Sequence, residues 1–222
     1  MNVLITGTSS GIGKAAALLF LQNGFTVYGI DIKDSSIEDD NYHHYIADIK
    51  DKESLPSLPD IDILINNAGV QNSGHDIDTN LKGSINVTEK YGIHEGIKSI
   101  LFNASASAST GYEFGEYVAS KAGLIGYMKN IACKVAKYKA TCNSLSLGGV
   151  VTDLNKPVME DKKMWQKIMD VTPLKKWATV EEVASWIYFL TVINKSASGI
   201  DIVVDNGESN LNNTFVWPDY KL

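Results

Sequence analysis

The sequence predicts a doubly wound α/β fold of one domain, in which a seven-stranded parallel sheet carries helices on both faces. Short runs rich in valine and isoleucine alternate along the chain with longer stretches in which apolar residues recur at helical spacing. The run at 61–65 is apolar except for one aspartate, which is typical of strands buried on both faces. The length of 222 residues and the 44% hydrophobic share suit a single core spanning residues 1–222.

Each element is expected where its pattern occurs. The chain opens with an apolar strand, and the β-branched runs that follow predict the remaining ones, which gives strands at residues 3–6, 26–30, 45–47, 61–66, 99–103, 141–145 and 200–204. Helical spacing predicts helices at residues 14–23, 81–92, 117–137, 157–170 and 180–191. Gly24 stands where a left-handed C-cap residue is expected, and Thr179 with Glu182 forms a capping-box pattern.

The charge and cysteine content exclude several kinds of partner. The net charge is −6 and all 20 basic residues are lysines, so we expect no nucleic-acid partner, which would need a concentrated basic face. Cys133 and Cys142 form no Cys-x-x-Cys pair and the four histidines show no metal-binding spacing, so we expect no metal. The chain shows neither a signal sequence nor an apolar stretch of membrane-spanning length, so we expect a cytoplasmic protein without a membrane partner.

A glycine-rich turn follows the first strand and predicts a dinucleotide site. It reads Thr-Gly-Thr-Ser-Ser-Gly-Ile-Gly over residues 6–13. Glycines let the backbone approach a phosphate closely, and the N-terminus of the next helix directs free N–H groups at the anion. We therefore expect a Rossmann-type pyrophosphate site formed by Gly7, Ser9, Ser10, Gly11, Ile12 and Gly13.

Asp31 at the end of the second strand bears on the choice of cofactor. A carboxylate there accepts both hydroxyls of the adenosine ribose and repels a 2′-phosphate. The chain has no arginine to accommodate that phosphate, so NAD is favoured, while the nearby Lys33 leaves NADP as the less favoured alternative.

Several further motifs stand in order along the chain. They are Asp-Ile at 48–49, Asn-Asn-Ala-Gly at 66–69, Thr-Asn-Leu-Lys-Gly at 79–83 and Tyr-Val-Ala-Ser-Lys at 117–121. Together with the glycine turn, they resemble the motifs of the short-chain dehydrogenase/reductase family in its standard, non-extended form. The resemblance covers nearly the whole chain and implies a nicotinamide-dependent oxidoreductase.

Tyr117 and Lys121 stand four residues apart, so they share one helix face. A phenol has a pKa of about 10, and a nearby ammonium group lowers this pKa by stabilising the phenolate. Tyr117 can then act as general acid when a ketone is reduced and as general base when an alcohol is oxidised. The resemblance adds that Lys121 holds the nicotinamide ribose and that Asn80 supports a water relay to the lysine.

The carbonyl-polarising serine is less directly indicated. The family motif ends the fifth strand with Asn-x-Ser-Ser, but here Asn103 is followed by alternating alanine and serine, so a gapless match places Ala106 at the catalytic position. Ser105 is the preferred candidate for the serine that donates to the substrate carbonyl, and Ser107 is the next. The alternative is a turn of small residues whose hydroxyls bind local backbone groups.

The resemblance also implies the rest of the cofactor site. It assigns adenine contacts to Asp48 and Ile49, and further cofactor contacts to Asn67, Ala68, Gly69, Tyr117, Lys121, Gly148, Val150 and Thr152. Two departures stand out: the stretch at 70–79 resembles a trimmed version of the family's loop and helix, and Leu147 replaces a proline before Gly148.

Residues 153–172 carry apolar side chains on a lysine-rich helix, in the place of the family's substrate lid. Simple core packing of this helix is the alternative. Tyr112, Phe114 and Trp177 are candidates for the pocket wall, and the substrate is expected to be a small carbonyl compound or secondary alcohol.

By family analogy alone, the helices that begin at Leu81 and Tyr117, with the last strand, would build a homodimer or homotetramer. A second function stays open, in which the protein is an NAD(H)-binding sensor with little or no turnover. The displaced serine and the trimmed loop favour it, whereas intact Asn80, Tyr117 and Lys121 oppose it.

Overall fold

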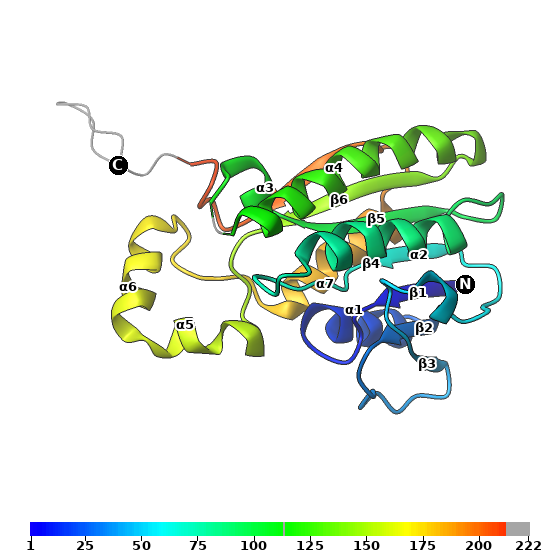
Figure 1. Cartoon of the computed structure of the whole chain (residues 1–222), viewed down its shortest axis with the longest axis horizontal. Coiled ribbons are helices and arrows are strands. Elements are labelled where there is room, and N and C mark those ends of the chain that lie inside the picture. Colours follow the sequence, from blue (N-terminus) through cyan, green and yellow to red (C-terminus); the bar gives the residue numbers. More distant parts are fainter. Residues whose placement is uncertain (113, 212–222) are drawn as a thin grey trace.

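The structure is a computed structural model that describes residues 1–112 and 114–211. One parallel sheet of seven strands runs in the order β3-β2-β1-β4-β5-β6-β7, with helices on both faces (Figure 1). The predicted fold class is therefore confirmed. The predicted domain extends to residue 222, so its final segment, 212–222, lies outside the described residues.

The strands occupy the apolar runs of the sequence. Strands β4, β5 and β6 are buried along their whole lengths, as expected for a parallel sheet covered on both faces. Strands β3 and β7 form the two edges. The bounds are β1 Asn2–Thr6, β2 Thr26–Asp31, β3 Tyr42–Ile46, β4 Ile63–Asn66, β5 Ser99–Ser105, β6 Thr141–Leu147 and β7 Asp201–Val204.

The helices divide between the two faces and enclose two hydrophobic clusters. Helices α1 (Gly11–Gln22) and α7 (Val180–Tyr188) cover one face, and α2 (Ser84–Tyr91) and α4 (Gly115–Val135) cover the other (Figure 1). Helix α2 continues a π-helical stretch, Ile77–Gly83, and α7 runs into another, Phe189–Ile193. The short helices are α3 Ser107–Thr110, α5 Lys156–Glu160 and α6 Lys162–Val171, with 3₁₀ turns at Lys52–Ser54, Ala136–Tyr138 and Asp153–Asn155.

The strand order reverses at β1, which lies between β2 and β4. The connections that leave β1 and β4 diverge at such a point, which opens a crevice at the carboxyl ends of the strands. The glycine turn follows β1 and the Asn-Asn-Ala-Gly segment follows β4, so the fold brings these two motifs to the same crevice.

Two local predictions of helix termini are confirmed. Gly24 adopts a φ of 76°, the left-handed conformation expected of a C-cap residue. At the start of α7, the Thr179 hydroxyl accepts the Glu182 N–H and the Glu182 carboxylate accepts the Thr179 N–H, which is the predicted capping box.

Most predicted boundaries agree to within a few residues, and three elements show the most informative differences. The single helix expected at 157–170 is two helices, because Asp161 is extended and its carboxylate caps α6 by accepting the N–H groups of Lys163 and Met164, both at 3.0 Å. Strand β3 was expected at 45–47 but begins at Tyr42, which pairs with Val27. The helix expected at 81–92 begins earlier, because its π-helical first part already starts at residue 77.

Two negative findings hold for the described part of the chain. None of its helices combines the length and apolar character needed to cross a membrane. No three histidine, cysteine, aspartate or glutamate side chains within residues 1–112 and 114–211 gather where they could hold a metal ion.

Candidate active site

The glycine turn after β1 packs so tightly that its glycines are required. A Cβ at Gly13 would lie 2.0 Å from the Gly7 carbonyl oxygen, and one at Gly7 would lie 2.9 Å from Ala68 Cα. Gly7 and Gly11 also have positive φ values, 77° and 53°. The Asn67 amide donates to the Thr6 carbonyl at 2.9 Å, which joins the segment after β4 to the turn.

The N-terminus of α1 is open to an anion. Ser10 is extended at the N-cap and its side chain caps no backbone N–H, and the first turn holds no acidic residue. The free N–H groups and the positive end of the helix dipole therefore point out of the glycine turn. Together with the close packing of Gly7 and Gly13, this arrangement fits a pyrophosphate group.

Asp31 ends β2 beside the glycine turn. One carboxylate oxygen accepts the Ser9 N–H and the other accepts the Lys33 N–H, both at 3.0 Å. Two backbone donors thus hold the carboxylate beside Ser9, in the place expected for the adenosine ribose.

A polar network supports this region, and sequence reasoning missed it. The Tyr42 hydroxyl donates to buried Thr8 Oγ1 at 2.8 Å, and lies 2.9 Å from His44 Nδ1. His44 Nε2 lies 2.8 Å from the carbonyl oxygen of Lys33. Strand β3 therefore supports the glycine turn at Thr8 and the segment that follows β2 at Lys33. No local sequence motif predicts such a network, because its residues come together only when β2 and β3 pair.

The two residues expected at the adenine have side chains engaged elsewhere. Ile49 is buried and packs on Gly83, where a Cβ would lie 2.7 Å from the Ile49 side chain. Asp48 accepts the Lys50 N–H at 3.0 Å and pairs with the Lys50 ammonium at 3.5 Å. The adenine contacts of these residues stay a prediction.

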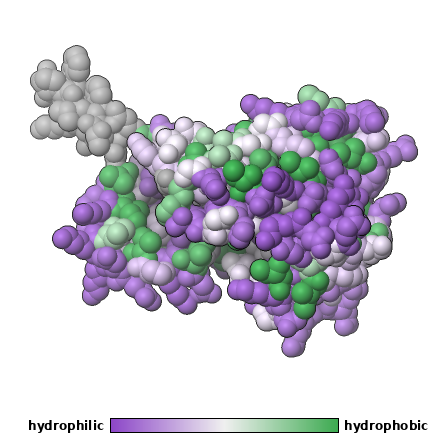
Figure 2. All heavy atoms as spheres, in the orientation of Figure 1, coloured by the Kyte–Doolittle hydropathy of each residue, from purple (hydrophilic) through white to green (hydrophobic). Residues whose placement is uncertain are grey.

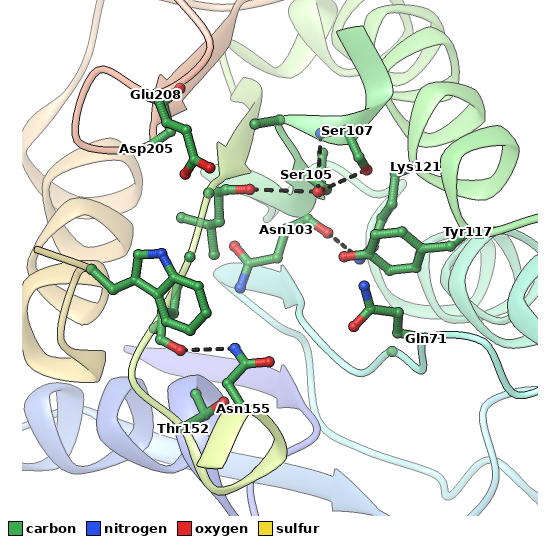
Figure 3. A pocket seen from close by; sticks show the side chains of 18 of the residues that line it. Gln71, Asn103, Ser105, Ser107, Tyr117, Lys121, Thr152, Asn155, Asp205 and Glu208 are labelled. Carbon is green, nitrogen blue, oxygen red and sulfur yellow. Dashed lines mark hydrogen bonds between the residues drawn. The ribbon is translucent and has the colours of Figure 1, made fainter. Parts of the chain in front are cut away.

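Tyr117 and Lys121 come together on α4 as predicted. Lys121 is 6% exposed, and its Nζ donates to the backbone carbonyl of Asn103 at 2.9 Å. The same Nζ lies 5.6 Å from the centre of the Tyr117 ring, and Figure 3 shows the phenol reaching into the cavity beside the lysine. A buried ammonium group next to a phenol stabilises the phenolate.

Asn80 lies in the π-helical stretch before α2 and is 1% exposed. Its side chain accepts the Val70 N–H at 2.8 Å and donates to the Val70 carbonyl at 2.9 Å and to Ser120 Oγ at 3.0 Å. The geometry thus makes Asn80 a link between the loop after Gly69 and α4. The relay role stays a prediction.

Ser105 is the last residue of β5, Ser107 is the first residue of α3, and both serines line the cavity. The Ser107 hydroxyl and N–H both reach Ser105 Oγ, at 2.9 Å and 3.2 Å. Ala106, which stands between them, donates its N–H to the Leu147 carbonyl at 2.9 Å.

A cavity of about 690 Å³ joins these groups (Figure 3). The predicted site residues that line it are Ile12, Asn67, Gly69, Ser105, Tyr117, Lys121, Gly148, Val150 and Thr152. Tyr112 and Trp177 line it as expected, whereas Phe114 is not among the lining residues. Gly149 admits the Trp177 indole, since a Cβ there would lie 2.0 Å from Trp177 Nε1.

Several polar residues of the wall were not predicted as site residues, among them Gln71, Asn155, Asp205 and Glu208. Asn155 donates to the Val150 carbonyl at 2.9 Å. Burial alone would raise the pKa of Asp205, but hydrogen bonds from the Ser209 hydroxyl and from backbone N–H groups outweigh burial and lower it. Asp205 and Glu208 close the wall opposite Tyr117 (Figure 3). Asp205 begins an Asp-Asn-Gly sequence, which by itself indicates a turn and not a cavity contact.

Two buried polar atoms of the wall, Asn103 Oδ1 and Trp177 Nε1, lack a partner among the described residues. Asn103 Nδ2 donates to Asn67 Oδ1 at 2.7 Å, but Asn103 Oδ1 accepts no hydrogen bond from the described part of the chain. A buried acceptor in the cavity wall fits a hydroxyl-bearing ligand such as a ribose. The glycine turn and the α1 N-terminus thus fit the pyrophosphate of a dinucleotide, and the Asn103 oxygen fits one of its riboses.

Helices α5 and α6 form an arm beside the carboxyl ends of the strands (Figure 1). Leu154 and Val171 of this region line the cavity, and the Trp165 ring of α6 packs edge-on against Trp177 with centroids 5.0 Å apart. Figure 2 shows apolar side chains gathered on this arm, and Leu154, Met164 and Val171 are exposed there.

Comparisons with known proteins agree with this geometry. The family model described as Enoyl-(Acyl carrier protein) reductase matches residues 7–209. The 3-oxoacyl-[acyl-carrier-protein] reductase FabG of Thermotoga maritima is 31% identical, over 92% of this chain and 96% of that protein.

Two solved structures are similar over nearly their whole lengths. A 4-hydroxyisoleucine dehydrogenase complexed with NADH is 26% identical with a TM-score of 0.84, and covers 95% of this chain and 99% of its own. The aldohexose dehydrogenase of Thermoplasma acidophilum is also 26% identical with a TM-score of 0.84. The match covers 97% of this chain and 96% of that enzyme's chain. Motifs, fold and comparisons together make this chain a member of the short-chain dehydrogenase/reductase family, an oxidoreductase fold that binds a nicotinamide dinucleotide.

Proposed function

We propose that the protein interconverts a small carbonyl compound and a secondary alcohol with NAD(H), with Tyr117 as the general acid and base. The observation that carries this proposal is the grouping of Tyr117, buried Lys121 and the Ser105–Ser107 pair around one cavity next to the glycine turn. A protein that only binds the cofactor has no use for a phenol beside a buried ammonium group.

The chain's own groups divide the work of the reaction. Ser105 donates a hydrogen bond to the carbonyl oxygen as negative charge develops there. The Tyr117 hydroxyl gives its proton to that oxygen during reduction and takes it back during oxidation. Lys121 stabilises the phenolate that remains. The nicotinamide, when bound, supplies or accepts the hydride.

The preference for NAD rests on Asp31. Its carboxylate is held by the N–H groups of Ser9 and Lys33 at 3.0 Å, so a 2′-phosphate would meet a fixed negative charge. No arginine stands anywhere in the chain to offset that charge. The similar 4-hydroxyisoleucine dehydrogenase, which was solved with NADH, agrees with this preference.

The cavity wall favours a small substrate without negative charge. Its charged lining residues are Lys121, Asp205 and Glu208, and the lysine already donates to Asn103. A substrate carboxylate would therefore meet two carboxylates and no further cation among the described lining residues. The similar proteins are named for different substrates, so their names do not identify the substrate of this protein.

We further propose that the arm at 153–172 acts as a substrate lid. Leu154 and Val171, which stand near the two ends of the arm, line the cavity. The contact between Trp165 and Trp177 connects α6 to the cavity wall. Closure of such an arm would exclude water from the reacting groups.

For assembly, we propose a homodimer or homotetramer that uses the expected helices, α2 and α4, and the last strand, β7, together with the surface of α7 beside that strand. Trp186 and Phe189 are 40% and 44% exposed there, and with Leu174 they line a groove of about 680 Å³. An exposed apolar face beside a sheet edge is typical of a contact between copies. Light scattering coupled to gel filtration tests this, since Trp186→Glu should lower the mass of a dimer to that of a monomer and the mass of a tetramer to that of a dimer.

The decisive test compares wild type with Tyr117→Phe. NADH and NADPH binding is followed by cofactor fluorescence, and oxidation of NADH is then measured against a panel of small ketones and aldehydes. We expect tighter binding of NADH, turnover of at least one compound, and a variant that binds NADH equally but has lost activity. Tyr112→Phe removes a phenol hydroxyl from the same cavity and serves as the matched control.

The alternative is an NAD(H) sensor, which Ala106 at the gapless serine position favours. If the wild type and Tyr117→Phe bind NADH equally and neither converts any compound of the panel, the result supports a sensor function. That outcome would contradict the proposed oxidoreductase activity.

A further inference from the structure

Ser105 and Ser107 form a hydrogen-bonded pair in the cavity wall. Ser105 is the last residue of β5 and Ser107 the first of α3, and they are 6% and 5% exposed. The Ser107 hydroxyl donates to Ser105 Oγ at 2.9 Å, and the Ser107 N–H donates to the same oxygen at 3.2 Å. Two donors from one residue therefore converge on a single hydroxyl oxygen.

The hydrogen of the Ser105 hydroxyl is held only weakly. Its acceptor is the Leu147 carbonyl, 3.5 Å from Oγ, which is long for an O–H···O hydrogen bond. The same carbonyl already accepts the Ala106 N–H at 2.9 Å. Because Leu147 keeps a good partner, Ser105 can turn its hydrogen toward a ligand at little cost.

The Ser107 hydroxyl is in the opposite situation, since its hydrogen is already donated to Ser105. A hydroxyl that accepts hydrogen bonds is polarised and becomes a stronger donor itself. Figure 3 shows the Ser105 oxygen at the meeting point of these contacts, on the cavity side of β5. Hydrogen-bond donation in the pair thus runs from Ser107 to Ser105, and the Ser105 hydroxyl can donate onward into the cavity.

We propose that Ser107 is a positioning residue that acts through Ser105. Its hydroxyl and N–H fix and polarise the Ser105 hydroxyl, which donates to the substrate carbonyl. This inference rests on the proposed function, and it gives different roles to two serines that the sequence motif left as alternatives.

The test is a double-mutant cycle in steady-state kinetics, measured with a carbonyl compound that the wild type reduces. Ser105→Ala, Ser107→Ala and the double variant are compared with Ser109→Ala, whose hydroxyl belongs to the same short helix and donates to the Ala106 carbonyl at 3.0 Å. Ser107→Thr keeps a hydroxyl at the position. Thermal melting and NADH titration of each variant exclude effects on folding and on the cofactor site.

We expect Ser105→Ala to lower kcat by roughly 100-fold, the usual loss of an oxyanion donor, with little change in KM. Ser107→Ala should lower kcat by about 5- to 10-fold. The double variant should have the same kcat as Ser105→Ala, because Ser107 acts only through the Ser105 hydroxyl. Ser107→Thr should recover most of the activity, and Ser109→Ala should match the wild type.

Two results would overturn the inference while leaving the proposed function in place. One is that Ser107→Ala lowers kcat by the same factor in the wild type and in the Ser105→Ala variant. The other is that Ser107→Ala lowers kcat more than Ser105→Ala does. A wild type that reduces no carbonyl compound would instead contradict the proposed function, and the inference with it.

Discussion

The Lys121 ammonium group donates a hydrogen bond to the backbone carbonyl of Asn103, with 2.9 Å between Nζ and the oxygen. This bond joins α4 to the end of β5, so the lysine is held in position by the protein rather than by a ligand. Groups fixed before the reaction need no reorganisation while charge develops. The cation beside Tyr117 is therefore part of the rigid scaffold.

Lys121→Met is expected to lower turnover by at least about 100-fold, because the phenolate of Tyr117 loses its stabilising charge. It should also weaken NADH binding, whereas Tyr117→Phe should not. Steady-state rates and fluorescence titration separate the two effects. Lys129→Met, an exposed lysine on the same helix, is the control and should behave as wild type. Unchanged turnover in Lys121→Met would contradict the assignment.

Replacement of Asp31 by asparagine should reduce the preference for NADH over NADPH. The variant keeps the shape but removes the charge that opposes a 2′-phosphate, so the ratio of the two dissociation constants should fall at least about tenfold. Titration of cofactor fluorescence measures both constants. Asp34→Asn removes the same charge from an exposed position and should leave the ratio unchanged. If Asp31→Asn preserves the ratio, cofactor choice depends on other residues.

The glycine turn should not tolerate a methyl group. A Cβ at Gly13 would lie 2.0 Å from the Gly7 carbonyl oxygen, so Gly13→Ala must shift the backbone and should destabilise the fold by about 1–3 kcal/mol. Gly126 on α4 has open space around it, and Gly126→Ala should be stabilising by up to about 1 kcal/mol. Urea unfolding of both variants gives the comparison. A Gly13→Ala protein as stable as the wild type would contradict the described packing.

The stability that Asp205 contributes should depend on pH. Although burial favours the neutral form, the hydrogen bonds from Ser209 and the backbone are stronger and lower the pKa of this carboxyl. A lowered folded-state pKa gives stability that is fully present above the unfolded value of about 4, and is lost as the pH falls through the folded-state value.

Urea unfolding of wild type and Asp205→Asn between pH 7 and pH 3 tests this. The difference in unfolding free energy should be largest near neutral pH and should shrink below about pH 4. Ser209→Ala removes one donor to the carboxylate and should show part of the same loss. A difference that stays constant across this range would contradict the assignment.

The sequence predicted the sheet because parallel strands buried on both faces leave a strong local signal. The glycine turn, Asp31 and the Tyr117–Lys121 pair were also predictable, because each depends on spacing within one segment. Edge strand β3 was misplaced, since Tyr42, His43 and His44 give it no continuous apolar run. Its true start is fixed by pairing with β2, which is a tertiary contact.

The parts that could not be predicted depend on side chains meeting across the fold. Asp161 ends one helix and caps the next, and helical spacing alone does not distinguish this from one continuous helix. Asp205 and Glu208 reach the cavity only because β7 lies beside β6. The roles that we propose for the two serines depend on the direction of their hydrogen bonds, which no spacing reveals.

The contact between Trp165 and Trp177 gives the protein a built-in optical reporter. Their rings lie 5.0 Å apart in an edge-to-face arrangement, one on the arm and one on the wall. Indole rings this close couple electronically, so the near-ultraviolet circular dichroism of the pair depends on their separation. Any displacement of the arm would change that signal without a dye or a label. Closure of the proposed lid could thus be followed separately from cofactor binding in the unmodified chain.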